Sequence, residues 1–286
     1  MNTFIIDVSS WNADRNTTTN VYTVKLNPQQ MIDTGCIGAI IRLNSGTWLD
    51  PAAEQFVTQL SIGNIPIGAY YYNKPDELIG EIYKPTDPIK IATVFSNRVK
   101  QLGGLDAFKL GFYCDAPEKI GGAVYTEHTF KSIETVISLL SPDMRKVGIY
   151  TNKNFWRSNS GERPEYVNKA MTYQLWCALW NNAPGTIPVA PIDYYPNPWK
   201  VFNKWLFHQY SADNNRMARI IGVMSGDPDI DLSIFNPMLG KFESYFGIVK
   251  PIPIDPILPI PTVPSPDYEN HEQRIKDLED WKNKPL

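Results

Sequence analysis

The sequence predicts an α/β fold: a closed, TIM-like β/α barrel, followed by a proline-rich linker and a short C-terminal helix. Short apolar runs suited to buried strands alternate with helix-like stretches, which is typical of parallel βα units. Seven or eight such units in about 240 residues suit a closed barrel better than an open doubly wound sheet. The glycine-rich phosphate fingerprints of nucleotide-binding sheets are also missing from the chain.

The apolar runs and the stretches between them give the expected elements in order. Strands are expected over residues 4–8, 37–43, 65–72, 109–114, 147–150, 174–179 and 205–210. Helices are expected over residues 52–60, 89–102, 126–140 and 164–170. Together these elements predict a barrel domain over residues 1–245.

The composition changes near residue 250, where proline becomes frequent. Proline fixes its own φ and lacks an N–H donor, so residues 246–267 are expected to form an extended linker. Residues 268–286 carry Tyr268, Ile275, Leu278 and Trp281 at spacings near seven and three, which is typical of a short helix or coiled-coil seam. An isolated helix of this length is marginal. It either pairs with another chain, giving a homo-oligomer, or frays.

The bulk composition excludes several classes of ligand. A net charge of −3 gives no reason to expect nucleic acid. No apolar run is long enough to insert in a membrane, and the N-terminus lacks the pattern of a signal peptide, so we expect a chain made in a cytoplasm. Cys36, Cys114 and Cys177 form no CxxC or Cys/His cluster, which predicts buried thiols and no zinc. Asp227 and Asp229 lie in an acidic cluster without the glycine and terminal glutamate of an EF-hand loop, so neither a metal nor a cofactor is predicted.

Carboxylates at the ends of apolar runs are the most informative feature for function. Asp7 ends the first run and is followed closely by Trp11, and two more runs end at Asp115 and Asp231. The strands of a β/α barrel carry the active site at their C-terminal ends. Three carboxylates are therefore expected to share one site, which would suit a polar, sugar-like substrate.

Seven short motifs occur in register between residues 4 and 235. In chain order they are IDVSSW (6–11), AIIR (39–42), IGAYYY (67–72), GIYTN (148–152), LWCA (175–178), HQYS (208–211) and DIDL (229–232). In this order the chain resembles glycoside hydrolase family 25, the lysozymes (N-acetylmuramidases) common in bacteria and their phages. The proline-rich tail lies outside the resemblance.

The resemblance implies that Asp7, Asp115 and Asp231 are catalytic, and it also implies a glutamate two residues after Asp115 as general acid. The sequence departs from that pattern, because Pro117 occupies the glutamate position and Glu118 follows it. Strand residues two apart share a face, so a three-residue spacing sends the second carboxylate away unless the strand has ended. Proline indicates that the ladder stops here. Two readings stay open: a shifted acid at Glu118, or a barrel that has lost its acid.

Polar and aromatic residues near the expected strand ends are candidates to bind a glycan, and are otherwise packing residues. They are Trp11, Arg42, Tyr70, Tyr72, Tyr150, Trp176 and Gln209. Only alternate members of the run Tyr70 to Tyr72 can face the barrel interior. Arg42 is expected to pair with a carboxylate of the barrel mouth. An insertion over residues 184–199 is either an aromatic lip of the cleft or an interface with another protein.

Two functions follow from the resemblance, and another kind of barrel hydrolase with carboxylates at its strand ends is a third alternative. The first is hydrolysis of the β-1,4 bond between N-acetylmuramic acid and N-acetylglucosamine in peptidoglycan by a phage-associated lysozyme. The second is an inactive barrel that binds cell-wall glycan or forms part of a virion. In either case the expected partner is the glycan strand of peptidoglycan, and the expected place of action is the bacterial cell wall or a phage particle.

Overall fold

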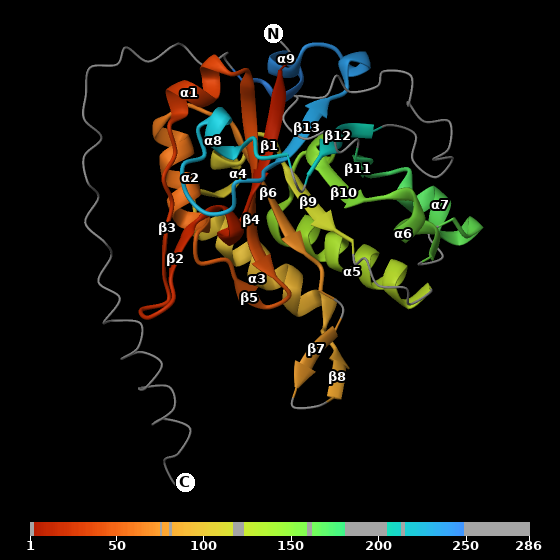
Figure 1. The fold of residues 1–286 in the computed structure, drawn as a ribbon. Coiled ribbons are helices and arrows are strands. Elements are labelled where there is room, and N and C mark those ends of the chain that lie inside the picture. The colour runs from red at the N-terminus through yellow and green to blue at the C-terminus, as the bar shows by residue number, and fades with distance from the viewer. Residues whose placement is uncertain are drawn as a thin grey trace, which may run out of the picture. The chain divides into compact units, whose positions relative to one another are not determined.

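The computed structural model describes residues 3–74, 76–79, 82–116, 123–158, 162–180, 205–212 and 215–248. These residues form a closed barrel with helices packed around it (Figure 1). The predicted linker at 246–267 lies outside the described residues from residue 249 onward. The predicted tail helix at 268–286, the insertion at 184–199, Pro117 and Glu118 lie outside them entirely.

Eight strands close the barrel, because β1 pairs with β4 as well as with β13. In order around the barrel they are β1 (Phe4–Val8), β4 (Cys36–Ser45), β6 (Ile67–Tyr72), β9 (Phe112–Asp115), β10 (Val147–Thr151), β11 (Gln174–Ala178), β12 (Trp205–Ser211) and β13 (Asp231–Phe235). Each predicted strand has its counterpart here. The prediction of a TIM-like β/α barrel is confirmed.

The last strand runs against the other seven. β13 pairs antiparallel with both β12 and β1, whereas the remaining pairs of the barrel are parallel. The prediction that an apolar run ends at Asp231 is therefore wrong, since Asp231 is the first residue of β13. An antiparallel strand begins where its parallel neighbours end. Asp231 thus still reaches the C-terminal end of the parallel strands, which we call the mouth.

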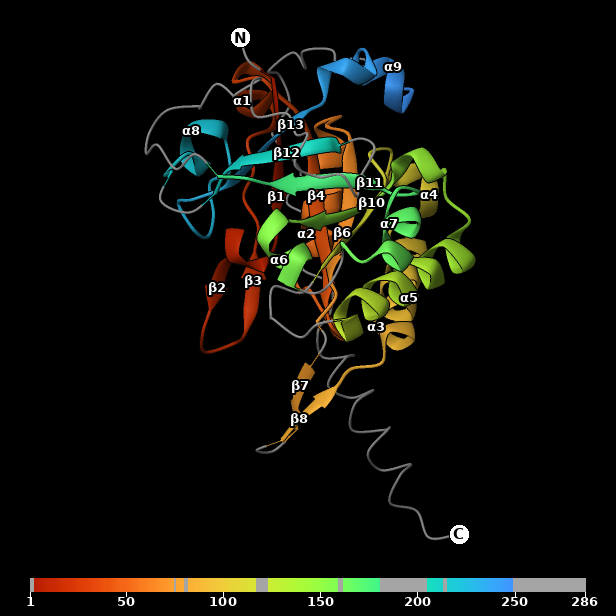
Figure 2. The same ribbon diagram turned by 90° about the vertical axis from the view of Figure 1, so that its right-hand side faces the viewer.

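Helices cover the outside of the barrel (Figure 2). The four predicted helices correspond to α2 (Ala53–Ile62), α3 (Pro88–Gln101), α5 (Ala123–Leu140) and α7 (Pro164–Ala170). Helix α3 begins at an Asp87 N-cap followed by proline and buries Ile91, Phe95 and Val99 at helical spacing.

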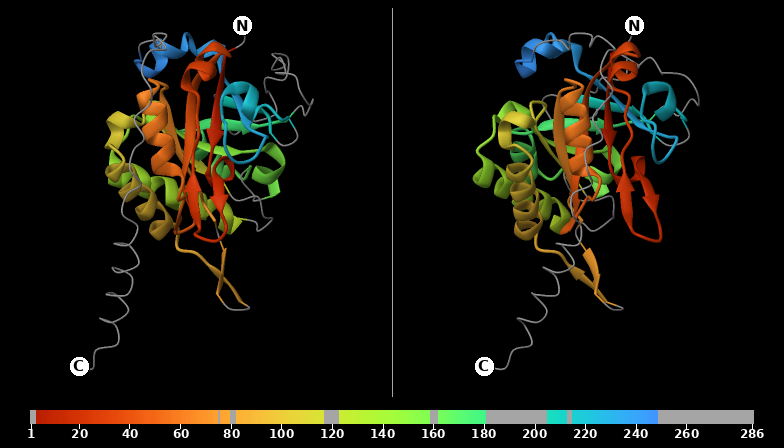
Figure 3. Two further views of the ribbon diagram at one scale, coloured as in Figure 1. Left: turned by 60° about the vertical axis from the view of Figure 1, so that its left-hand side comes forward. Right: turned by 90° about the vertical axis from the view of Figure 1, so that its left-hand side faces the viewer.

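Several short elements had no prediction. They are β2 (Asp14–Asn16), β3 (Val21–Thr23), β5 (Trp48–Leu49), β7 (Asp76–Ile79), β8 (Ile82–Pro85), α1 (Pro28–Asp33), α4 (Gly104–Ala107), α6 (Lys153–Ser158), α8 (Ala218–Ile221) and α9 (Phe242–Phe246), with single 3₁₀ turns at Ser10–Asn12, Met144–Lys146 and Pro237–Leu239. The hairpins β2–β3 and β7–β8 project at the end of the barrel opposite α9 (Figure 3). That end is the mouth.

Apolar side chains fill the barrel below the mouth. Ile5, Ile40, Tyr113, Trp176 and Phe207 form one buried cluster with α9. The Phe246 ring stacks on the Phe207 ring at 5.9 Å between centroids. Helix α9 therefore closes the far end of the barrel, and the packed chain continues past the predicted boundary at residue 245.

Replacing Gly148 by alanine should destabilise the barrel. A Cβ at this position of β10 would lie 2.8 Å from the Gln174 carbonyl oxygen and 2.9 Å from Tyr113 Cδ1. Relieving this overlap inside a packed core costs roughly 1–3 kcal/mol. Urea unfolding of Gly148→Ala should show that loss in the free energy of unfolding. An unchanged midpoint would mean that both Tyr113 and the backbone at Gln174 can shift without cost.

The prediction of buried thiols is confirmed, since Cys36, Cys114 and Cys177 are all buried and unbridged. Burial raises the pKa of the Cys36 and Cys177 thiols to about 12, so they are inert as nucleophiles at neutral pH. Among the described residues, no helix has the length and apolar character needed to cross a membrane.

Candidate active site

The alternation of strand side chains brings the predicted site residues to the mouth. Each of four mouth residues lies two positions beyond a buried interior residue: Asp7 after Ile5, Arg42 after Ile40, Asp115 after Tyr113, and Gln209 after Phe207. Residues two apart on a strand point to the same side. Side chains of β1, β4, β9 and β12 therefore form one polar layer above the apolar interior.

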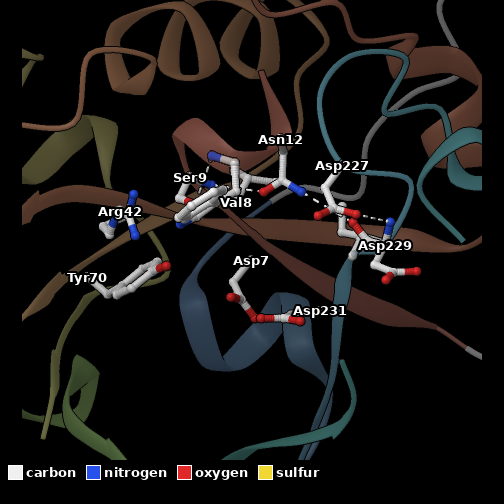
Figure 4. Close-up of a pocket in the computed structure, with 11 residues that line it drawn as sticks. Asp7, Val8, Ser9, Asn12, Arg42, Tyr70, Asp227, Asp229 and Asp231 are labelled. Atoms are coloured by element: carbon white, nitrogen blue, oxygen red, sulfur yellow. Dashed lines mark hydrogen bonds between the residues drawn. The ribbon is translucent and has the colours of Figure 1, made fainter. Parts of the chain in front are cut away.

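Two cavities that share Asp7, Tyr70 and Asp231 open at the mouth. The first has a volume of about 340 Å³ and is also lined by Val8, Ser9, Trp11, Asn12, Arg42, Asp227, Asp229 and Ile230 (Figure 4). The second has a volume of about 240 Å³ and is also lined by Asp115, Tyr150, Trp176, Trp180, Gln209 and Ala212. The two cavities therefore adjoin at the three shared residues, and together they form an acidic depression at the mouth.

Asp7 and Asp231 form a carboxyl pair. They are directly opposite each other in the β1–β13 ladder, and Gln209 Nε2 donates to Oδ2 of Asp7 at 2.9 Å and to Oδ2 of Asp231 at 3.3 Å. Burial raises the pKa of Asp7 to about 6, and the hydrogen bonds of Gln209 and Asp231 and the charge of Arg42 offset only part of that rise. One member of such a pair can therefore hold a proton near neutral pH.

Arg42 forms its ion pair with Asp50, a mouth carboxylate that the sequence did not single out, and not with one of the carboxyls that line the cavities. Its Nη2 lies 2.9 Å from Oδ2 of Asp50 and donates to the Ser10 hydroxyl at 3.0 Å. Asp50 also accepts from the backbone N–H of Ser10 and of Ala52. The loop after β5 folds back and supplies this buried partner, while the charge of Arg42 still acts on Asp7 and Asp115.

Three aromatic side chains lie between the carboxyls and the interior. Trp176 is 1% exposed, and its ring makes edge contacts with Tyr70 at 5.9 Å and Tyr150 at 4.7 Å between centroids. Its Nε1 donates to the Ser233 hydroxyl at 3.0 Å. Burial, together with the charges of Asp7, Asp115 and Asp231, raises the pKa of both tyrosines, so they are neutral donors at the base of the depression.

The rim of the depression is aromatic. Trp11 is 73% exposed and lines the first cavity, and Trp180 is 43% exposed and lines the second. Trp48 of β5 is 49% exposed and lies over the Arg42 guanidinium. Exposed indole faces at a polar cleft are suited to stack on sugar rings.

The run from Tyr70 to Tyr72 alternates as expected. Tyr71 points outward, where it packs on Phe95 and accepts a hydrogen bond from the Ser132 hydroxyl. Tyr70 lines both cavities, whereas Tyr72 lines neither, although it is the ladder neighbour of Asp115.

The chain remains paired up to the end of β9 and one residue further. The Ala116 N–H donates to the Tyr150 carbonyl oxygen at 2.9 Å, and the Asn73 N–H donates to the Asp115 carbonyl oxygen at 3.0 Å. Because Glu118 is outside the described residues, its role as the shifted acid stays a prediction.

Some mouth residues were not expected from the sequence. Asp50 precedes a helix, and that position is a recognisable helix-start signal, but its pairing with Arg42 depends on how the loop folds. Asn12 and Asp229 line the first cavity, where the Asn12 side-chain amide donates to the Asp229 carbonyl oxygen at 3.3 Å. Within the part of the chain that the structure describes, no group of three or more His, Cys, Asp or Glu side chains is arranged to hold a metal ion.

A closed β/α barrel with several carboxyls collected at its mouth is an architecture that supports glycoside hydrolysis. The family model for glycosyl hydrolases family 25 matches residues 6–218, and the chain belongs to this family. A search of curated proteins found no significant match.

Among the solved structures that share this fold are a bacterial lysozyme, the catalytic domain of a phage endolysin and a muramidase. The bacterial lysozyme from Streptomyces coelicolor has 22% identity and a TM-score of 0.57, with 87% of this chain and 97% of that chain covered. The catalytic domain of the endolysin ply40 from bacteriophage P40 of Listeria monocytogenes has 18% identity and a TM-score of 0.55, with 86% and 98% covered. A muramidase from Trichobolus zukalii has 16% identity and a TM-score of 0.56, with 86% and 98% covered. At these identities the similarity establishes a shared fold.

Proposed function

We propose that the protein is a peptidoglycan hydrolase, a lysozyme that cleaves the β-1,4 bond between N-acetylmuramic acid and N-acetylglucosamine. The observation that carries this proposal is the convergence of Asp7, Asp115 and Asp231 on one depression with an aromatic rim. Membership of glycosyl hydrolases family 25 supports it, as does the presence of lysozymes and muramidases among proteins of the same fold.

The proposed roles divide the carboxyls by environment. Asp115 stabilises the positive charge that develops at the sugar, or the acetamido group that assists. Glu118 protonates the leaving oxygen. Asp7 and Asp231 orient the substrate and tune the pKa values of their neighbours. Trp11, Arg42, Tyr70, Tyr72, Tyr150, Trp176 and Gln209 were predicted to bind substrate, and all except Tyr72 line the two cavities.

A phage origin is the proposed context. It is supported by an endolysin of a Listeria phage among the proteins of the same fold. In this context the chain acts on the bacterial wall after synthesis in the host, or as part of a phage particle. The proposed homo-oligomer through residues 268–286 belongs to the same context.

A second function is favoured by Pro117 at the position where the family pattern has its glutamate. In that case the barrel binds wall glycan without cleaving it, or serves as a structural part of a virion. The aromatic rim and the carboxyls would then recognise the glycan only.

Turbidity of purified peptidoglycan distinguishes the two functions. For the hydrolase, the wild-type protein clears the suspension and Glu118→Gln loses at least roughly 10²-fold in rate, the contribution typical of a general acid. Failure of the wild type to clear several wall types, together with its sedimentation with the walls, would support the binding barrel. Full activity of Glu118→Gln would remove Glu118 from the mechanism.

A further inference from the structure

The side-chain amide of Gln209 has no hydrogen-bonding capacity left for a ligand. An amide offers two N–H donors and two acceptor lone pairs. Nε2 donates to Oδ2 of Asp7 at 2.9 Å and to Oδ2 of Asp231 at 3.3 Å. Oε1 accepts from the Tyr150 hydroxyl at 2.7 Å and from Trp180 Nε1 at 2.6 Å. Since Gln209 is also only 1% exposed, it acts on the residues around it and not on substrate directly.

Trp180 and the carboxyl pair fix the same orientation of the amide, since an ionised carboxyl can only accept a hydrogen bond. An indole N–H can only donate, so the amide atom opposite Trp180 Nε1 has to be the oxygen. The nitrogen then points at Asp7 and Asp231. Tyr150 does not impose this choice, because its hydroxyl can donate or accept and so tolerates either orientation.

The orientation has an electrostatic consequence. An amide N–H favours the charged form of a carboxyl that it contacts, and an amide oxygen disfavours it. In the present arrangement the hydrogen bond from Gln209 lowers the pKa of Asp7 against the larger effect of burial. Turning the amide over would remove this support and place an oxygen against two carboxyls.

We propose that Gln209 is a positioning residue, oriented by Trp180, that holds the carboxyls of Asp7 and Asp231 side by side at the mouth. The proposal deepens the proposed function and rests on it for its catalytic meaning. Trp180 is 43% exposed and lines the second cavity. A sugar ring that stacks on Trp180 therefore touches one of the groups that orient the amide, which connects occupancy of the rim to the state of the carboxyl pair.

Titration of the Asp7 carboxyl tests the proposal without any requirement for activity. The full chain is labelled with ¹³C at aspartate carboxyls, and the Asp7 signal is assigned by its loss in Asp7→Asn. In Gln209→Met, which removes the amide at similar length, the Asp7 midpoint should rise by about one pH unit, because a hydrogen bond to a charged group is lost. Trp180→Phe keeps an aromatic ring but removes the N–H, and it should move the midpoint in the same direction.

Gln55→Met is the matched control. The Gln55 amide is bonded on both sides to the backbone near β3, to the Val24 N–H and the Tyr22 carbonyl oxygen. Its loss weakens local structure and should leave the Asp7 midpoint in place. A midpoint that does not move in folded Gln209→Met and Trp180→Phe would overturn the proposal. If Gln209→Met does not fold, Gln209→Leu replaces it in the same titration.

The outcome is separable from that of the proposed function. A shifted midpoint in a protein that does not hydrolyse peptidoglycan would refute the hydrolase and keep the positioning role. Hydrolysis by a protein whose Asp7 midpoint does not move in the variants would support the hydrolase and refute the positioning role.

Discussion

Asp115→Asn is expected to reduce the rate of peptidoglycan hydrolysis by roughly 10³-fold or more while leaving the fold intact. The substitution preserves side-chain size at the end of β9 but removes the negative charge that would stabilise the developing oxocarbenium ion. The charge of Asp115 acts on Tyr70, Tyr150 and Arg42 in the resting protein, so it lies where it can act on a bound sugar. The measurement is the initial rate of release of new reducing ends.

Asp106→Asn is the matched control for this experiment. Asp106 is in α4, its side chain is fully exposed, and its contact with Lys109 is a surface ion pair, which contributes little. This variant should hydrolyse peptidoglycan at the wild-type rate. If Asp115→Asn does the same, the placement of the reaction at Asp115 is wrong.

Asp7→Asn should change how stability depends on pH. The pKa of Asp7 is raised to about 6 from its ordinary value of 3.8, so between these values the folded protein binds more protons than the unfolded chain. The stabilisation of the fold by the protonated Asp7 carboxyl is complete below about pH 4, and it is lost as pH rises through about 6. At 1.36 kcal/mol per pH unit, the loss amounts to about 3 kcal/mol. Because asparagine resembles the protonated carboxyl, Asp7→Asn should lack this loss.

The difference between wild type and Asp7→Asn in free energy of unfolding, measured by urea from pH 4 to pH 8, gives the effect directly. It should grow in favour of the variant as pH rises. Because Asp7 and Asp231 are neighbours that share the Gln209 amide, the difference belongs to the pair. Asp143→Asn is the matched control: Arg145 lowers the pKa of Asp143 from its ordinary value of 3.8, so the pH dependence of its contribution falls below about pH 4 and the difference between wild type and this variant should stay nearly constant from pH 4 to pH 8. A difference for Asp7→Asn that does not depend on pH would show that Asp7 is not the buried acid of the mouth.

The barrel was predictable because its strands are short apolar runs of near-correct length. The runs ending at Asp7 and Asp115 also predicted the shared site, since residues at the C-terminal ends of parallel strands meet at one mouth. The direction of β13 was not predictable, because a run of alternating residues reads the same in either direction. Asp231 nevertheless lies at the predicted site, because the antiparallel strand β13 begins at the end of the barrel where the parallel strands end.

Side-chain partners were harder to predict than positions. Arg42 was correctly expected at the mouth, but its partner Asp50 comes from a loop whose path is set by tertiary packing. Gln209 was expected to contact substrate, and only the distances to its four partners reveal that its amide is fully engaged. No local pattern in a sequence carries that information.

The identity of the reducing ends released from purified peptidoglycan, determined by mass after borohydride reduction, tests whether the carboxyls of this mouth form a muramidase site. The wild-type protein should produce ends that carry reduced N-acetylmuramic acid, and Asp115→Asn should produce none above background. Ends that carry N-acetylglucosamine, or muramic ends that persist with Asp115→Asn, would show that the carboxyls of this mouth do not form such a site.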